Sequence, residues 1–78
     1  MRYYFHLRES GDYLVDPEGL ELLDLQHVRH AAIASARSVM AGDVITGKLP
    51  LNAVVEVDDE NGARVLDLPF RDAVHLDG

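Results

Sequence analysis

Residues 25–46 read LQHVRHAAIASARSVMAGDVIT, and this is the one stretch of the chain with a long helical pattern. Apolar side chains recur in it at spacings of three and four, which places them on one side of a helix. They are Leu25, Val28, Ala32, Ala36, Val39 and Met40. Because most are small, the helix axis can lie close to the layer that it covers. The segments on both sides have strand patterns, so we expect that layer to be a β-sheet.

The ends of this helix also follow from the sequence. Asp24 is suited to the N-cap, since its carboxylate can accept from the first free amides and its charge suits the positive end of the helix dipole. We expect the helix to run from Leu25 to about Thr46 and to stop at Gly47. Gly42-Asp43 is a poor helical pair, so we expect fraying or a bend there.

The residues before the helix predict two short strands. Residues 2–8 alternate, with Tyr3, Phe5 and Leu7 on the face toward the helix. A turn at Ser10-Gly11 leads to a second strand over residues 13–15, and a turn at residues 16–19 (DPEG) ends it. Residues 20–23 extend briefly before the helix.

The residues after the helix predict a hairpin. Residues 53–57 and 63–68 are rich in β-branched side chains, and Asn61-Gly62 between them supplies the positive-φ positions of a tight turn. Pro69 ends the second strand and positions Phe70 as a core anchor. For residues 72–78 we expect a short edge strand or a turn packed back on the sheet.

These elements give a single α+β domain over residues 1–78. It has two layers, an antiparallel sheet of about four strands with one long helix on one face, in the order β-β-α-β-β.

Charge and composition limit the partners. The chain has 78 residues and a net charge of −7, from 14 acidic and 7 basic residues. The bases are dispersed along the chain, so we expect no direct contact with nucleic acid, whereas a basic protein is an electrostatically suitable partner. There is no cysteine, no membrane-length apolar run, and no apolar leader before the first strand. We therefore expect a cytoplasmic protein.

The sheet face that points away from the helix is the candidate interaction face. Its predicted members are Tyr4, His6, Arg8, Val54 and Glu56. A face with Tyr and Val among polar groups is only half suited to water, so a second copy, another partner or the C-terminal tail could cover it. We expect a homodimer. Alternatively, His6 pairs with acids such as Glu56 across the strands, or an enzyme uses His6, Tyr4 and Arg8.

No motif predicts catalysis, a cofactor or a metal. His27 and His30 stand three apart on the helix, but sequence spacing supplies no further ligands. The acidic run at residues 58–60 lies at a hairpin tip, where carboxylates serve solubility. The serines lack an elbow motif, and no glycine loop suits phosphate. We expect Arg71 and Asp72 to form a structural ion pair or a loop-capping contact that shapes the tail.

Several segments together resemble a known family. These are RYYFH at residues 2–6, the DPEG turn, the alanine-rich helix and LPFRDAV at residues 68–74. They resemble small bacterial proteins grouped as a domain of unknown function, and this resemblance implies no activity, ligand or partner. The layout from Arg2 to about Ala41 also resembles antitoxins of the HicB type. That second resemblance implies an alternative function, an acidic domain that masks a small basic ribonuclease.

Overall fold

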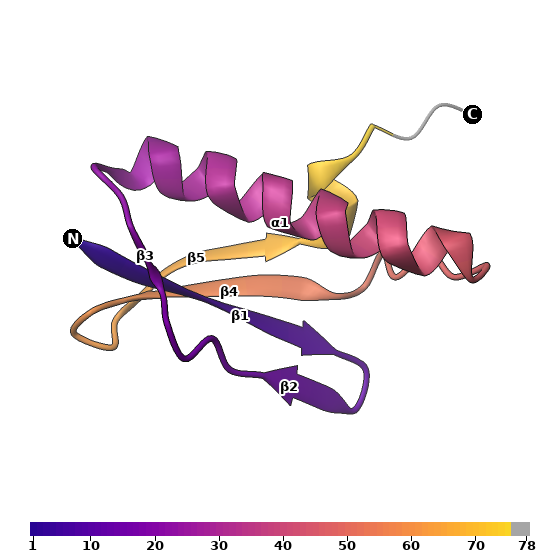
Figure 1. Cartoon of the computed structure of the whole chain (residues 1–78), viewed down its shortest axis with the longest axis horizontal. Coiled ribbons are helices and arrows are strands. Elements are labelled where there is room, and N and C mark those ends of the chain that lie inside the picture. The colour runs from indigo at the N-terminus through magenta and orange to yellow at the C-terminus, as the bar shows by residue number, and fades with distance from the viewer. Residues whose placement is uncertain (76–78) are drawn as a thin grey trace.

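A computed structural model describes residues 1–75, and within them one long helix lies on one side of an antiparallel sheet (Figure 1). The elements are β1 (Arg2–Glu9), β2 (Asp12–Leu14), β3 (Leu20–Glu21), α1 (Leu25–Ile45), β4 (Val54–Asp59), β5 (Arg64–Pro69) and a 3-10 turn, η1 (Phe70–Ala73). The predicted α+β class, the two layers and the antiparallel pairing are confirmed.

The first strand of the chain, β1, pairs with β4 in the middle of the sheet, and β2 and β5 lie at its edges. The strand order reads β2-β1-β4-β5, and the two-residue β3 pairs with the start of β1. β3 is the brief extension expected before the helix, and it adds a fifth, very short strand. Since β4 already occupies the other side of Tyr3, β3 lies on the same edge as β2.

The core lies between α1 and the sheet. Val28, Ala32, Ala36 and Met40 of α1 are buried, as the small-residue pattern predicts. They pack with buried side chains of the sheet and of η1, namely Tyr3, Ala53, Val55, Val57, Leu68, Phe70 and Ala73. α1 contacts β4, β5 and η1, which explains why the predicted anchor Phe70 is fully buried.

Both predicted helix ends are confirmed. Asp24 Oδ1 accepts a hydrogen bond from the amide of His27 at 2.9 Å, and Gly47 has the positive φ of +86° that stops a helix. The helix continues through Gly42 and Asp43 to Ile45, with Thr46 as its C-cap. Leu25 lies outside the core although its position fits the stripe, because side chains in the first turn point back beyond the start of a helix.

The β4–β5 hairpin forms as expected with one difference in its turn. Gly62 has a φ of +82°, but no non-glycine residue within residues 1–75 has positive φ, so Asn61 does not share this conformation. Instead, Asp59 holds the turn, since its Oδ1 accepts from the amides of Asn61 at 2.9 Å and Ala63 at 3.0 Å. These hydrogen bonds to the Asp59 side chain hold the turn without a second residue of positive φ.

The segment after β5 is a turn packed against the helix. Arg37 Nε donates to the carbonyl of Ala73 at 2.6 Å, and Ala73 is buried. A turn was one of the two forms expected for the tail, but it packs mainly on α1 and not on the sheet. The part of that expectation that concerns residues 76–78 lies outside the described residues.

Candidate functional site

The predicted interaction face is assembled as the strand alternation requires. β1 turns Tyr3, Phe5 and Leu7 toward the helix layer, so Tyr4, His6 and Arg8 lie on the opposite face. The β1–β4 register places His6 opposite Glu56 and Arg8 opposite Val54. All five predicted residues are therefore neighbours on two adjacent central strands.

Charged contacts on this face run diagonally across the register. Arg8 Nε donates to Glu56 Oε2 at 2.6 Å, and His6 Nε2 lies 3.3 Å from Asp58 Oδ2. The expected pairing of His6 with Glu56 is thus replaced by two diagonal pairs, because side chains of this length reach the next residue on the same face. His6 and Glu56 are 8% and 7% exposed, so both polar groups are buried.

Arg64 of β5 links three carboxylates. Its guanidinium contacts Asp58 at 2.6 Å, Asp67 at 2.9 Å and Glu56 at 3.2 Å. A register shift makes this possible: Val57 pairs with Leu66 whereas Asp58 pairs with Arg64, which leaves Val65 as an extra residue. The bulge lets Arg64 lie on the outward face although Leu66 points into the core.

Two residues from β2 and the following turn cover part of the same face. The Cζ atom of Arg8 lies 4.3 Å from the ring centroid of Tyr13, a cation–π contact. Asp16 begins the turn that was predicted at residues 16–19, and its amide donates to His6 Nδ1 at 3.0 Å. We call Tyr13, Asp16 and the five predicted residues, with Asp58 and Arg64, the outward cluster.

The bond from Asp16 fixes the tautomer of His6. Because Nδ1 accepts a hydrogen bond from the Asp16 amide, the neutral ring carries its own proton on Nε2, which faces Asp58. The imidazole therefore joins the turn after β2 to β4, and both of its nitrogens are occupied.

Four members of the cluster, namely Arg8, Asp16, Glu56 and Arg64, are stabilised in their ionised forms. The hydrogen bond and charge of Arg8, with the charge of Arg64, hold the pKa of Glu56 below its ordinary value. The hydrogen bond of Glu56 raises the pKa of Arg8, and that of Asp58 raises the pKa of Arg64. Partial burial acts to raise the pKa of Asp16, but backbone donors from Phe5, Gly19 and Glu18 outweigh it and the pKa is lowered.

The carboxylates on β4 pair with the two arginines of the outward cluster. Each charged side chain in it has a partner within the chain, and no buried side-chain nitrogen or oxygen within residues 1–75 lacks a hydrogen bond. A general base needs a free lone pair beside a substrate, and both nitrogens of His6 are engaged. The contacts of the cluster thus join β1, β4, β5 and the turn after β2 into one network.

For the predicted Arg71–Asp72 pair, the structure shows a contact of Arg71 with a loop and not an ion pair. Both residues lie in η1, and Arg71 donates to the Oδ1 atom of Asn52. Among the salt bridges of the described residues none joins Arg71 to Asp72. A 3-10 turn directs consecutive side chains apart, which explains why Arg71 reaches the preceding loop instead.

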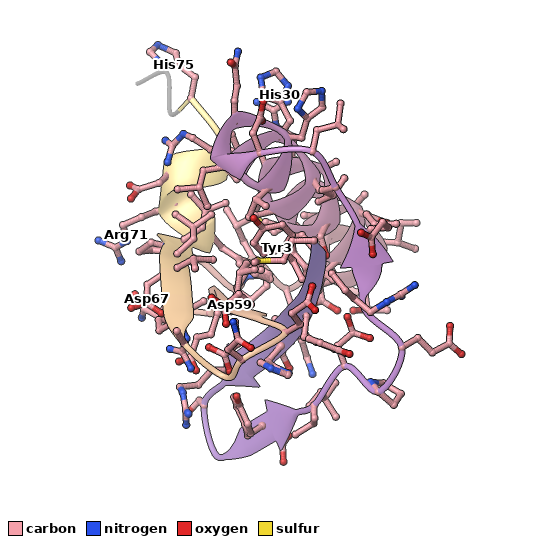
Figure 2. The ribbon with its side chains drawn as sticks, turned by 90° about the vertical axis from the view of Figure 1, so that its left-hand side faces the viewer. Tyr3, His30, Asp59, Asp67, Arg71 and His75 are labelled. Atoms are coloured by element: carbon pink, nitrogen blue, oxygen red, sulfur yellow. The ribbon has the colours of Figure 1, made fainter. Side chains whose placement is uncertain are left out.

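His27 and His30 line a shallow hollow on α1 together with Gln26. His27 Nδ1 lies 2.7 Å from the capping carboxylate of Asp24, and His30 points away from the sheet (Figure 2). Within residues 1–75 no group of three or more His, Cys, Asp or Glu side chains is arranged to hold a metal ion. A second hollow lies between the β1–β2 turn and the end of α1, lined by Glu9, Ser10, Asp43, Lys48, Leu49 and Pro50.

Sequence reasoning did not include Tyr13, Asp16, Asp58 and Arg64 in the face. The strand alternation predicts Asp58 on this face, since it follows Glu56 by two residues. To place Tyr13 on this face, the β1–β2 register must be known. To place Arg64 and Asp16 there, the position of the bulge and the path of the turn must be known. No local pattern supplies those three.

The fold is thus that of a two-layer α+β protein with its charged cluster on the uncovered side of the sheet. A family model described as Domain of unknown function (DUF6894) matches residues 2–71, and the chain belongs to this family. No curated protein and no solved structure matches the chain. No helix within residues 1–75 is long and apolar enough to cross a membrane.

Proposed function

We propose that this chain is a non-enzymatic protein–protein interaction domain that associates with a second copy of itself. One observation carries the proposal: large apolar side chains are exposed at both ends of α1. Leu23 is 87% exposed just before the helix and Ile45 is 86% exposed at its end. Leu25, Val44 and Leu49 beside them are more than half exposed. Such side chains gain free energy when a partner covers them.

The outward cluster supports an interface less well than its sequence suggested. Its charged groups are already paired, and Tyr13 and the Asp16 turn cover part of it. A partner on this face would have to exclude water from ion pairs without adding new ones, which is unfavourable. The chemistry of the two faces therefore favours association through the α1 side.

Light scattering coupled to size-exclusion chromatography tests the proposal. We expect the apparent mass to rise from one chain toward two as the protein concentration increases. The variant Ile45→Glu should shift this transition to higher concentration, because it places a charge at the proposed interface. The control is Leu14→Glu, which changes an exposed apolar residue on β2, away from the proposed interface. A monomer at all concentrations contradicts self-association.

The antitoxin-like function is the second candidate, and the charge of the chain favours it. A net charge of −7 suits a basic protein partner. Co-expression with a small basic protein encoded beside this chain is the test, with restored growth as the supporting result. Either function suits a cysteine-free protein of the reducing cytoplasm, which is where we place it.

A further inference from the structure

The side of α1 that faces away from the sheet carries a regular row of residues that contains no Asp, Glu, Lys or Arg. We call this set the α1 outer row: His27, Ala31, Ala34, Ser38, Ala41 and Ile45. The row lies opposite the buried stripe of Val28, Ala32, Ala36 and Met40. All of its members are exposed except Ala31, which is half-buried. Figure 2 shows the neighbouring His30 projecting from this side.

The spacing within the row alternates between four and three residues along the whole helix. This is the spacing at which one helix packs along another, because it keeps a straight seam on the helix surface. The four central residues are Ala or Ser, so a second helix can approach to the short end of the usual range of helix separations. A single helix turned to water does not require this pattern.

Apolar side chains mark both ends of the row. Leu23 lies just before its start, and Val44 and Ile45 lie at its end. If two copies of α1 run antiparallel, Leu23 of each copy lies near Val44 and Ile45 of the other copy. Two-fold symmetry about a point between Ala34 and Ser38 then places Ala31 opposite Ala41 and His27 opposite Ile45 of the second copy.

Charge makes this face the one through which a second copy is repelled least. α1 contains two basic residues, Arg29 and Arg37, and one acidic residue, Asp43, so its net charge is +1 in a chain of net charge −7. Two such chains therefore repel each other least when they meet through their helices. Antiparallel helices also place the positive end of each dipole beside the negative end of the other.

We propose that α1 packs antiparallel against α1 of a second copy through the α1 outer row. This rests on the proposed self-association and adds its surface, orientation and register. The resulting dimer has four layers, with the two sheets outside and the two helices between them. The outward cluster of each copy then remains in water, which suits its charged groups.

Disulfide trapping tests the orientation, because the chain contains no cysteine. Ala31→Cys and Ala41→Cys replace small residues at equivalent distances from the proposed axis. Under mild oxidation, a mixture of the two variants should give a 31–41 cross-linked dimer, and the double variant should cross-link efficiently. Ala31→Cys alone should give no cross-linked dimer, since two copies of position 31 lie ten residues of helix rise apart, about 15 Å.

The outcomes separate the two proposals. Cross-linking of Ala31→Cys with itself overturns the antiparallel orientation, and a dimer in light scattering without any cross-link overturns the surface. A protein that stays monomeric overturns self-association itself. Ala34→Glu is a further check, since two carboxylates at the centre of the seam should raise the dissociation constant by roughly tenfold or more. Circular dichroism of each variant confirms that it is folded.

Discussion

At the scale of single residues, Glu56 shows how this sheet keeps a charge on a central strand. Glu56 lies between β1 and β5 and is reached by Arg8 from one side and Arg64 from the other. A buried carboxylate without such partners would cost several kcal/mol of folding free energy. Because each partner comes from a different strand, the carboxylate links three strands and favours one register over its alternatives.

Glu56→Gln should therefore destabilise the fold. The amide keeps the shape of the side chain but loses its charge, which weakens the bonds to both guanidinium groups. We expect the free energy of unfolding to fall by about 1.5–3 kcal/mol, the range of hydrogen bonds to charged groups. Urea denaturation measures this change. Glu18→Gln on the exposed turn is the control, and an equal loss in both variants would contradict the role of Glu56.

Acid should remove the same stabilisation. The pKa of Glu56 is lowered in the folded protein from its ordinary 4.5, and that of Asp16 from 3.8, so folding favours both carboxylates. Their contribution is present above those ordinary values and is lost as the pH falls through the lowered ones. We expect the urea midpoint to fall as the pH drops from about 5 toward 3. The fall should be shallower in Glu56→Gln, and an unchanged slope would contradict the assignment.

At the scale of elements, the turn between β2 and β3 depends on a glycine. Gly19 has a φ of +71°, and a Cβ atom there would lie 2.9 Å from the carbonyl oxygen of Tyr3 and from the ring of Tyr4. The Asp16 carboxylate accepts from the amides of Phe5 and Gly19 and so holds this turn against β1. The close approach is what lets the turn lie over the outward cluster.

Gly19→Ala should consequently be more harmful than the same change at Gly11. Both glycines have positive φ, but an added Cβ at Gly11 meets nothing within 4 Å. The conformational strain of about 1–2 kcal/mol is common to both sites, so only Gly19→Ala adds a steric clash with the backbone of β1. We expect Gly19→Ala to have the lower melting temperature in calorimetry. Equal melting temperatures would show that the turn can move away from β1.

Elements were predicted better than the contacts between them. The cap at Asp24, the stop at Gly47 and the hairpin before Phe70 each depend on local chemistry, which adjacent residues contain. The alternation of residues 2–8 also identified the outward face. The partners on that face depend on strand register and on the bulge at Val65, and these arise from packing across the whole sheet. Arg71 is similar, because its contact with Asn52 depends on how η1 meets the loop before β4.

At the scale of the whole molecule, the charge is distributed unevenly between the two layers. α1 has a net charge of +1. Because the whole chain has a net charge of −7, the residues outside α1 have a net charge of −8. The acidic β4–β5 turn and Asp67 lie on the sheet side, as Figure 2 shows for Asp59 and Asp67. In the dimer that we propose, long-range repulsion comes mainly from residues outside α1, and the contact energy comes from the helices.

Self-association should accordingly strengthen with ionic strength. Salt screens the repulsion between two chains of net charge −7, whereas burial of Leu23 and Ile45 depends little on moderate salt. We expect the dimer dissociation constant to fall by roughly threefold or more between low and physiological salt. Sedimentation equilibrium at several sodium chloride concentrations measures it. If salt instead weakened the dimer, ion pairs would hold the interface together. The α1 outer row, which contains no Asp, Glu, Lys or Arg, could then not be the surface that the two copies share.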